Sequence, residues 1–91
     1  MIRSFRSKAL RDFFAEESRR GIRPDLVERE RNRLQALHRA KSLDDLRLPG
    51  WRLHALHTNP VRYAIAVNGP RRITFEWHDG DALRVDLEQY H

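Results

Sequence analysis

Histidine, arginine and tyrosine side chains in this sequence are of types that suit the chemistry of a phosphodiester. The chain ends in Tyr90-His91, and a second imidazole, His54, lies in an alternating run near its middle. An imidazole transfers protons near neutral pH, so either histidine can act as a general acid or base beside a bound phosphate. Arg72 can clamp a phosphate and stabilise the extra charge of a pentavalent transition state. These four residues are the candidate catalytic set.

Each candidate also has a plain structural interpretation, which the sequence leaves open. His54 can be an ordinary exposed histidine, and the tail can be a frayed terminus. Arg72 can form an ion pair with Glu76 of the same run or with Asp86 across the strands. His57 suggests a zinc site with His54, but an odd spacing on a strand points two side chains to opposite faces. The sequence therefore favours no metal site.

A β-hairpin would position Arg72 and the tail. Alternation over 71–77 and 82–87, around a turn at His78-Asp79-Gly80, predicts two antiparallel strands. One face is apolar and carries Ile73, Phe75, Trp77, Leu83, Val85 and Leu87. The other face carries Arg72, Thr74, Glu76, Arg84, Asp86 and Glu88. Parity with Arg52 puts His54 on the polar side of its own strand, which can share a surface with Arg72.

The remaining elements predict an α+β fold, in which an N-terminal strand and a helical hairpin pack on a small antiparallel sheet. A first helix is expected from Ser7 to a stop at Gly21, and a second from Pro24 to about His38. Ser42 to Asp45 resembles a capping box around one helical turn. The other expected strands cover 2–5, 51–55 and 63–67, with a turn at 68–70 and with Trp51 and Trp77 in the core.

Length and charge limit the classes of function. The 91 residues suffice for one domain, 1–91, and the sequence has no cysteine. It shows neither a signal peptide nor a run of about 20 apolar residues, which favours a cytoplasmic protein with no membrane contact. Residues 1–50 hold 13 basic against 8 acidic residues, and 51–91 hold 5 of each. A basic surface for polyanions is therefore expected on the helices, with Arg19, Arg20, Arg29, Arg31 and Arg33 as its main residues.

Several short motifs together resemble a known family. They are Met1-Ile2-Arg3-Ser4-Phe5, Leu53-His54-Ala55-Leu56 after Trp51-Arg52, Arg72-Ile73-Thr74-Phe75 and the final Tyr90-His91. In this order and spacing they look like a HigB-type toxin of the RelE/ParE superfamily, over essentially the whole chain. The resemblance implies a type II toxin-antitoxin system and an α+β, RelE/ParE-like fold.

The resemblance also implies an activity and partners. The toxin would cleave messenger RNA in the ribosomal A site, and a HigA-like helix-turn-helix antitoxin would neutralise it. Its partners would be rRNA and mRNA, with operator DNA contacted only through the antitoxin. The ribose 2′-oxygen would attack the adjacent phosphorus without metal or cofactor, leaving a 2′,3′-cyclic phosphate. His54, Tyr90 and His91 would then transfer protons or contact the phosphate, and Arg72 would stabilise charge.

Two positions depart from the family pattern. Family members carry a lysine where His57 stands and an aspartate where Gln89 stands. His57 keeps a cation only when protonated, and Gln89 can hydrogen-bond a base or ribose but cannot ionise. Both are therefore expected to position substrate rather than to transfer protons.

Two other functions fit the same residues. A ParE-like member of the same fold would inhibit a topoisomerase without catalysis, which the set of titratable groups disfavours and Gln89 mildly favours. A plain basic nucleic-acid-binding module would explain the charge, but the chain shows no recognisable binding motif.

Overall fold

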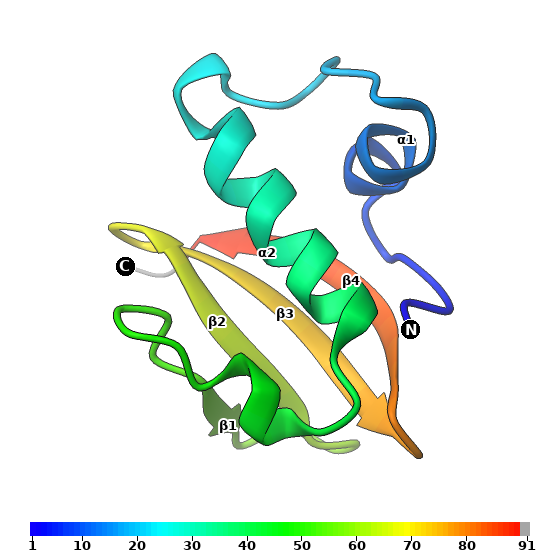
Figure 1. Ribbon diagram of the computed structural model, residues 1–91, viewed down its shortest axis with the longest axis vertical. Coiled ribbons are helices and arrows are strands. Elements are labelled where there is room, and N and C mark those ends of the chain that lie inside the picture. The colour runs from blue at the N-terminus through cyan, green and yellow to red at the C-terminus, as the bar shows by residue number, and fades with distance from the viewer. Residues whose placement is uncertain (90–91) are drawn as a thin grey trace.

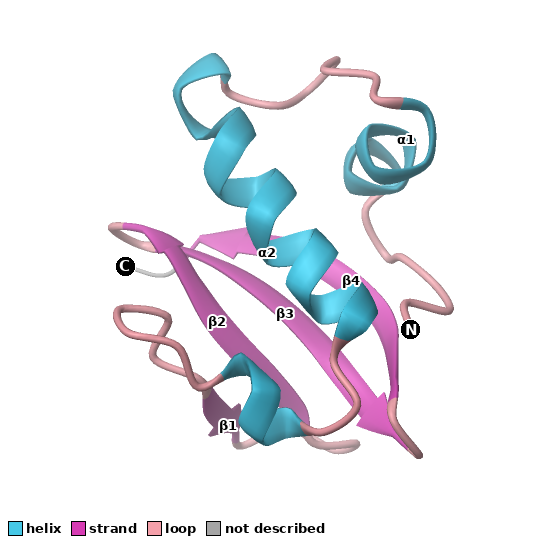
Figure 2. Cartoon of the chain, viewed as in Figure 1, coloured by secondary structure: helices cyan, strands magenta, loops and turns pink. Residues whose placement is uncertain are grey.

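The computed structural model describes residues 1–89 and shows helix α2 lying over one face of an antiparallel sheet (Figure 1). Figure 2 distinguishes the helices from the strands. The strands lie side by side in chain order and are β1 (His54–Leu56), β2 (Arg62–Asn68), β3 (Arg71–His78) and β4 (Asp81–Gln89). The helical elements are α1 (Lys8–Glu16), η1 (Pro24–Leu26), α2 (Val27–Arg39) and η2 (Leu43–Leu46). The α+β prediction is confirmed.

The N-terminal segment pairs with β4, but less regularly than predicted. Instead of a continuous strand over 2–5, two isolated parallel bridges join Ile2 to Ala82 and Phe5 to Val85. Between them, the backbone N–H of Arg84 donates to Ser4 Oγ at 2.9 Å. Arg84 has a left-handed backbone, with φ of 49°. The ladder is broken because β4 bulges at this residue.

The β3–β4 hairpin is confirmed, with one correction to its faces. Its turn residues, Asp79 and Gly80, both have positive φ, as a two-residue type I′ turn requires. The register shifts between Thr74 and Glu76, so that Glu76 pairs with Leu83. The shift puts Ala82, not Leu83, on the core side, where Ala82 is fully buried. The prediction for Leu83 was wrong because alternation assumes that a strand has no bulge.

The first helix begins where the sequence predicts but ends early, and the second begins as a 3-10 turn at Pro24 that becomes α-helical at Val27. Ser7 caps α1 by accepting a hydrogen bond from the Leu10 N–H at 3.2 Å. Glu17 adopts a left-handed conformation and ends the helix at Glu16, well before Gly21. The two helices follow one another as predicted, but α1 is seen end-on in Figure 1 whereas α2 lies along the sheet. Neither α1 nor α2 is long and apolar enough to cross a bilayer.

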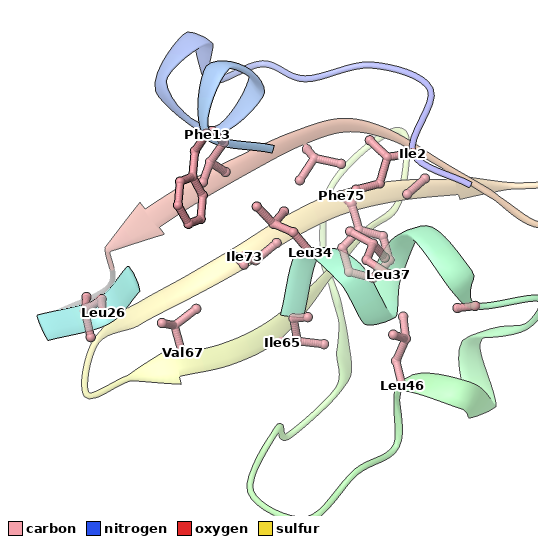
Figure 3. Close-up of a cluster of buried hydrophobic side chains, with 14 of the residues drawn as sticks. Ile2, Phe13, Leu26, Leu34, Leu37, Leu46, Ile65, Val67, Ile73 and Phe75 are labelled. Carbon is pink, nitrogen blue, oxygen red and sulfur yellow. The ribbon is translucent and has the colours of Figure 1, made fainter. Parts of the chain in front are cut away.

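The core lies between α2 and the sheet (Figure 3). Leu34 and Leu37 of α2 are completely buried, as are Ile65 and Ile73 of the strands beneath them. Trp51 and Trp77 are partly buried against this cluster, which confirms their predicted place. Truncating such a leucine costs about 2–5 kcal/mol, so α2 is held mainly by its apolar stripe.

The segment between α2 and β2 contains one confirmed element and one shorter than predicted. In η2 the carboxylate of Asp45 accepts from the backbone N–H of Ser42 at 3.3 Å, as a capping box requires. The strand expected from Trp51 begins only at His54. Arg52 interrupts it, because its φ of 51° is incompatible with a strand.

Glu30 on α2 is a buried carboxylate. It is 1% exposed, and neither side-chain oxygen accepts a hydrogen bond from any residue in the described range 1–89. Burial raises the pKa of this carboxyl above its ordinary value, and the positive charge of Arg71 opposes the shift. The folded protein therefore holds the proton more tightly than the unfolded chain does, so stability falls as pH rises through this window.

We expect Glu30→Gln to stabilise the protein at pH 7 by roughly 1–2 kcal/mol, because an amide is cheaper to bury than a carboxylate. The gain should vanish below about pH 4, where the carboxyl is protonated in both states. Thermal melting at pH 4 and pH 7 measures the difference, with Glu16→Gln, at an exposed position of α1, as control. An equal gain at both pH values would contradict this assignment.

Candidate active site

His54 and Arg72 face the same side of the sheet. The register pairs His54 with Ala64 and Ala64 with Thr74, and antiparallel partners point to one face. Arg72 is two residues from Thr74 and so shares that face, away from the core residue Ile73. The face predicted from alternation is confirmed. We call this side of the sheet, turned away from α2, the outer face.

The imidazole of His54 is exposed, and a backbone carbonyl just before β1 orients it. Its Nδ1 lies 2.8 Å from the backbone oxygen of Arg52. A carbonyl oxygen can only accept, so Nδ1 carries the proton. In the neutral ring this leaves the lone pair on Nε2, which is the atom available to accept a proton from a substrate.

Arg72 is half-buried and bonds to backbone oxygens. Its Nη1 donates to the carbonyl of Gly69 at 2.5 Å and to that of Arg71 at 3.0 Å. Neither of the predicted ion pairs, with Glu76 or Asp86, is formed within the described chain. The guanidinium is thus oriented by the β2–β3 turn without being neutralised, which suits it to an incoming anion.

A hollow of about 290 Å³ opens beside Arg72. The hollow is lined by Gly50, Arg52, Ala66, Val67, Asn68, Gly69 and Arg72. Within the described part of the chain, its only charged lining residues are Arg52 and Arg72, so its potential is positive. A hollow with this lining can hold a phosphate close to the strand that carries His54.

A family model described as the RelE-like toxin HigB of type II toxin-antitoxin systems matches residues 3–91. The chain belongs to this HigB-like toxin family. It is 35% identical over 92 residues to Endoribonuclease HigB of Proteus vulgaris, with 100% of both chains covered. It is also 33% identical over 93 residues to Toxin HigB-1 of Vibrio cholerae serotype O1, covering 99% of this chain and 98% of that one. The resemblance inferred from the motifs is confirmed.

The two departures from the HigB pattern lie apart from each other. His57 is exposed in the loop after β1. Gln89 is exposed at the end of β4 and pairs with Arg71, so it points to the side opposite Arg72. Tyr90 and His91 lie outside the described residues, and their roles stay predictions. Within residues 1–89 no group of three histidine, aspartate or glutamate side chains is placed to hold a metal ion.

The basic surface predicted for this HigB-like toxin is smaller than expected on α2. Arg33 turns inward, where its Nε donates to the Ala66 carbonyl at 2.6 Å and its guanidinium lies 4.8 Å from the centre of the Trp51 ring. Burial, followed by repulsion from Arg29, lowers the pKa of Arg33. Arg31 is bonded to Glu28 and lies over a phenyl ring. Neither is free for a polyanion, because a long side chain on a helix edge can fold onto the protein.

The exposed part of that surface comes from the connection between the helices and from one residue of α2. Arg19 and Arg20 are exposed in the connection rather than on a helix, since α1 ends at Glu16. Arg29 is exposed on α2. The available cations of the predicted set are therefore these three.

Sequence reasoning missed a buried ion cluster around Arg62 on the outer face. Arg62 is 6% exposed, and its Nη2 donates to Thr74 Oγ1 at 3.0 Å and to the Arg84 carbonyl at 2.8 Å. Its Nη1 is 3.4 Å from one oxygen of Glu76, which is 3% exposed. Arg84 binds the other oxygen of Glu76 at 2.8 Å. The sequence feature that could have indicated the cluster is Ala64, two residues after Arg62 on β2. Its small side chain leaves room for the long side chain of Arg62 to lie on the outer face.

Proposed function

We propose that this chain is the toxin of a type II toxin-antitoxin system and acts as a ribosome-dependent messenger RNA endonuclease. The family match and the endoribonuclease activity named for the Proteus vulgaris relative support the class of reaction. One observation on this chain carries the proposal: a histidine with a free Nε2 and an arginine without a carboxylate partner in residues 1–89 face the same side of the sheet.

The proposed reaction is a transesterification within the RNA. His54 Nε2 accepts the proton of the ribose 2′-hydroxyl while the 2′-oxygen bonds to the adjacent phosphorus. Arg72 stabilises the added charge of the pentavalent phosphorane. The bond from phosphorus to the 5′-oxygen then breaks, and the leaving oxygen takes a proton from the predicted tail residues, Tyr90 or His91. The products are a 2′,3′-cyclic phosphate and a 5′-hydroxyl, and no metal takes part.

The partners follow from the same proposal. A HigA-like helix-turn-helix antitoxin binds the toxin and contacts operator DNA, and the toxin itself meets rRNA and mRNA in the cytoplasm. Arg19, Arg20 and Arg29 are the exposed residues of the predicted basic surface, and they would contact rRNA phosphates with a strong dependence on salt. Residues 1–91 act as one toxin domain.

The test uses the purified chain and ribosomes programmed with a defined message. We expect cuts within A-site codons that leave 5′-hydroxyl ends. A message with a 2′-O-methyl group at the cleaved nucleotide should resist that cut, because it has no free 2′-hydroxyl to attack, while unmodified codons are still cut. Cleavage of the methylated site would overturn the mechanism, and an intact unmodified message would overturn the nuclease and favour a topoisomerase inhibitor.

A further inference from the structure

We propose that Arg52 binds a second phosphate of the RNA strand, next to the one held by Arg72, and at the same time positions His54 through its backbone carbonyl. This inference rests on the proposed nuclease function and adds to it a residue and a subsite. The side chain of Arg52 would bind the RNA, and its carbonyl would orient the general base of the same reaction.

The backbone of Arg52 is in a conformation that an arginine rarely adopts. Its φ is 51°, in the left-handed region that favours glycine. The neighbouring residue holds it there: the Trp51 N–H donates to Leu48 at 3.1 Å, and the Trp51 carbonyl accepts from the Ala66 N–H at 2.6 Å. With Trp51 fixed at both ends, the chain has to turn at Arg52 to enter β1. A strained backbone residue that its neighbours hold in place often has a functional role, and Arg52 is such a residue.

The turn directs the carbonyl of Arg52 at the imidazole of His54. The distance from that oxygen to Nδ1 is 2.8 Å. The contact fixes the tautomer in which Nε2 can accept a proton, so the left-handed backbone at Arg52 sets the protonation pattern of the general base. Arg52 is in this respect a positioning residue.

The side chain of Arg52 lines the same hollow as Arg72. Many arginines of this chain have a carboxylate partner within salt-bridge distance, among them Arg3, Arg23, Arg47 and Arg62. Within residues 1–89, Arg52 and Arg72 are among the arginines that have none, and both line this hollow. Two unneutralised guanidinium groups at one hollow favour an anion with repeated charges, and successive phosphates of an RNA strand supply them.

The geometry allows the two roles to be separated by substitution. Glycine adopts the left-handed conformation freely, so Arg52→Gly removes the side chain and keeps the carbonyl in place. A β-branched residue tolerates that conformation much less well than arginine does, so Arg52→Val removes the side chain and also disturbs the contact with His54. Arg52→Lys restores the charge. Arg39→Ala, at an exposed arginine at the end of α2, is the control for loss of one positive charge.

The experiment measures kcat and KM for cleavage on programmed ribosomes. We expect Arg52→Gly to raise KM about tenfold with kcat within about twofold of wild type, because one charge-assisted phosphate contact is lost. Arg52→Val should show the same rise in KM and a lower kcat with an altered pH profile. Arg52→Lys should recover most of KM. Equal KM values for wild type and Arg52→Gly, or the same change in Arg39→Ala, would overturn the phosphate contact, and equal kcat values for the glycine and valine variants would overturn the positioning role.

A binding measurement separates failure of this inference from failure of the nuclease function. A short 2′-O-methyl RNA, which the proposed reaction cannot cleave, is titrated into the labelled wild-type protein and observed through the arginine Nε–Hε signals in NMR. Shifts at both Arg52 and Arg72 in the wild type, with the Arg72 shift needing a higher RNA concentration in Arg52→Gly, support the subsite even if no message is cut. Shifts confined to Arg72 overturn it, whatever the cleavage assay shows.

Discussion

The His54→Ala variant is expected to lose about 10²- to 10⁴-fold in the rate of RNA cleavage, the usual effect of removing a general base. The loss should appear in kcat, because the imidazole transfers a proton in the transition state rather than holding the substrate. The variant should fold normally, since the ring is exposed and its hydrogen bond is to the carbonyl of Arg52. Single-turnover cleavage on programmed ribosomes measures the effect.

The control for His54→Ala is His78→Ala, at an exposed histidine at the end of β3, which should keep nearly wild-type activity. His91→Ala should be assayed in parallel, because the sequence predicts a second proton-transfer group there. Antitoxin binding should survive in both active-site variants. A His54→Ala protein that still cuts at the wild-type rate would remove His54 from the reaction and leave Tyr90 and His91 as the remaining predicted proton-transfer groups.

Arg62→Met is expected to destabilise the protein by about 3–5 kcal/mol, the cost of breaking a buried ion pair from one side. The change removes the hydrogen bonds to Thr74 and to the Arg84 carbonyl. It also leaves the Glu76 carboxylate, 3% exposed, with one arginine fewer. Urea unfolding at pH 7 measures the free energy, and a midpoint that moves without a change in slope identifies a pure loss of stability.

Two further variants separate the ion pair from the packing of the long side chain. Arg84→Met removes the other cation on Glu76, but its side chain is 58% exposed, so we expect a loss of about 1 kcal/mol or less. The double variant Arg62→Met with Glu76→Leu should recover much of the loss, because no unpaired charge stays buried. If the double variant is as unstable as Arg62→Met alone, the stabilisation comes from packing and not from charge.

The sequence predicts elements well where alternation is unbroken and poorly where the backbone is left-handed. The hairpin turn at Asp79-Gly80 was predicted because its residue types suit positive φ. Arg52 and Arg84 also have positive φ, but arginine gives no such signal, so the late start of β1 and the bulge in β4 were missed. The same cause explains Leu83, whose face is reversed by one extra residue in the strand.

Alternation of side chains along the strands was enough to predict which face of the sheet carries the candidate site. His54 and Arg72 were expected on one face from parity alone, and the register agrees. The destinations of long side chains were not predictable. Arg33 reaches a carbonyl 33 positions away in the chain and Arg62 reaches a carboxylate 14 away, and no local pattern records such partners. Counting charges in the sequence therefore overestimates the basic surface, and it does not reveal the buried cluster of Arg62 and Glu76.

The way backbone groups near both margins of the sheet are occupied bears on how the protein behaves at high concentration. Along β4 the N-terminal segment occupies backbone groups through the bridges at Ile2 and Phe5. Beyond the short β1, the N–H of Ala66 donates to Trp51 and its carbonyl accepts from Arg33. Unpaired strand edges recruit other chains and lead to aggregation. Because these groups are already bonded, a partner that binds by adding a strand finds little backbone to pair with at Ala82, Val85 or Ala66, and copies of the toxin that accumulate are less prone to edge-to-edge association at these positions.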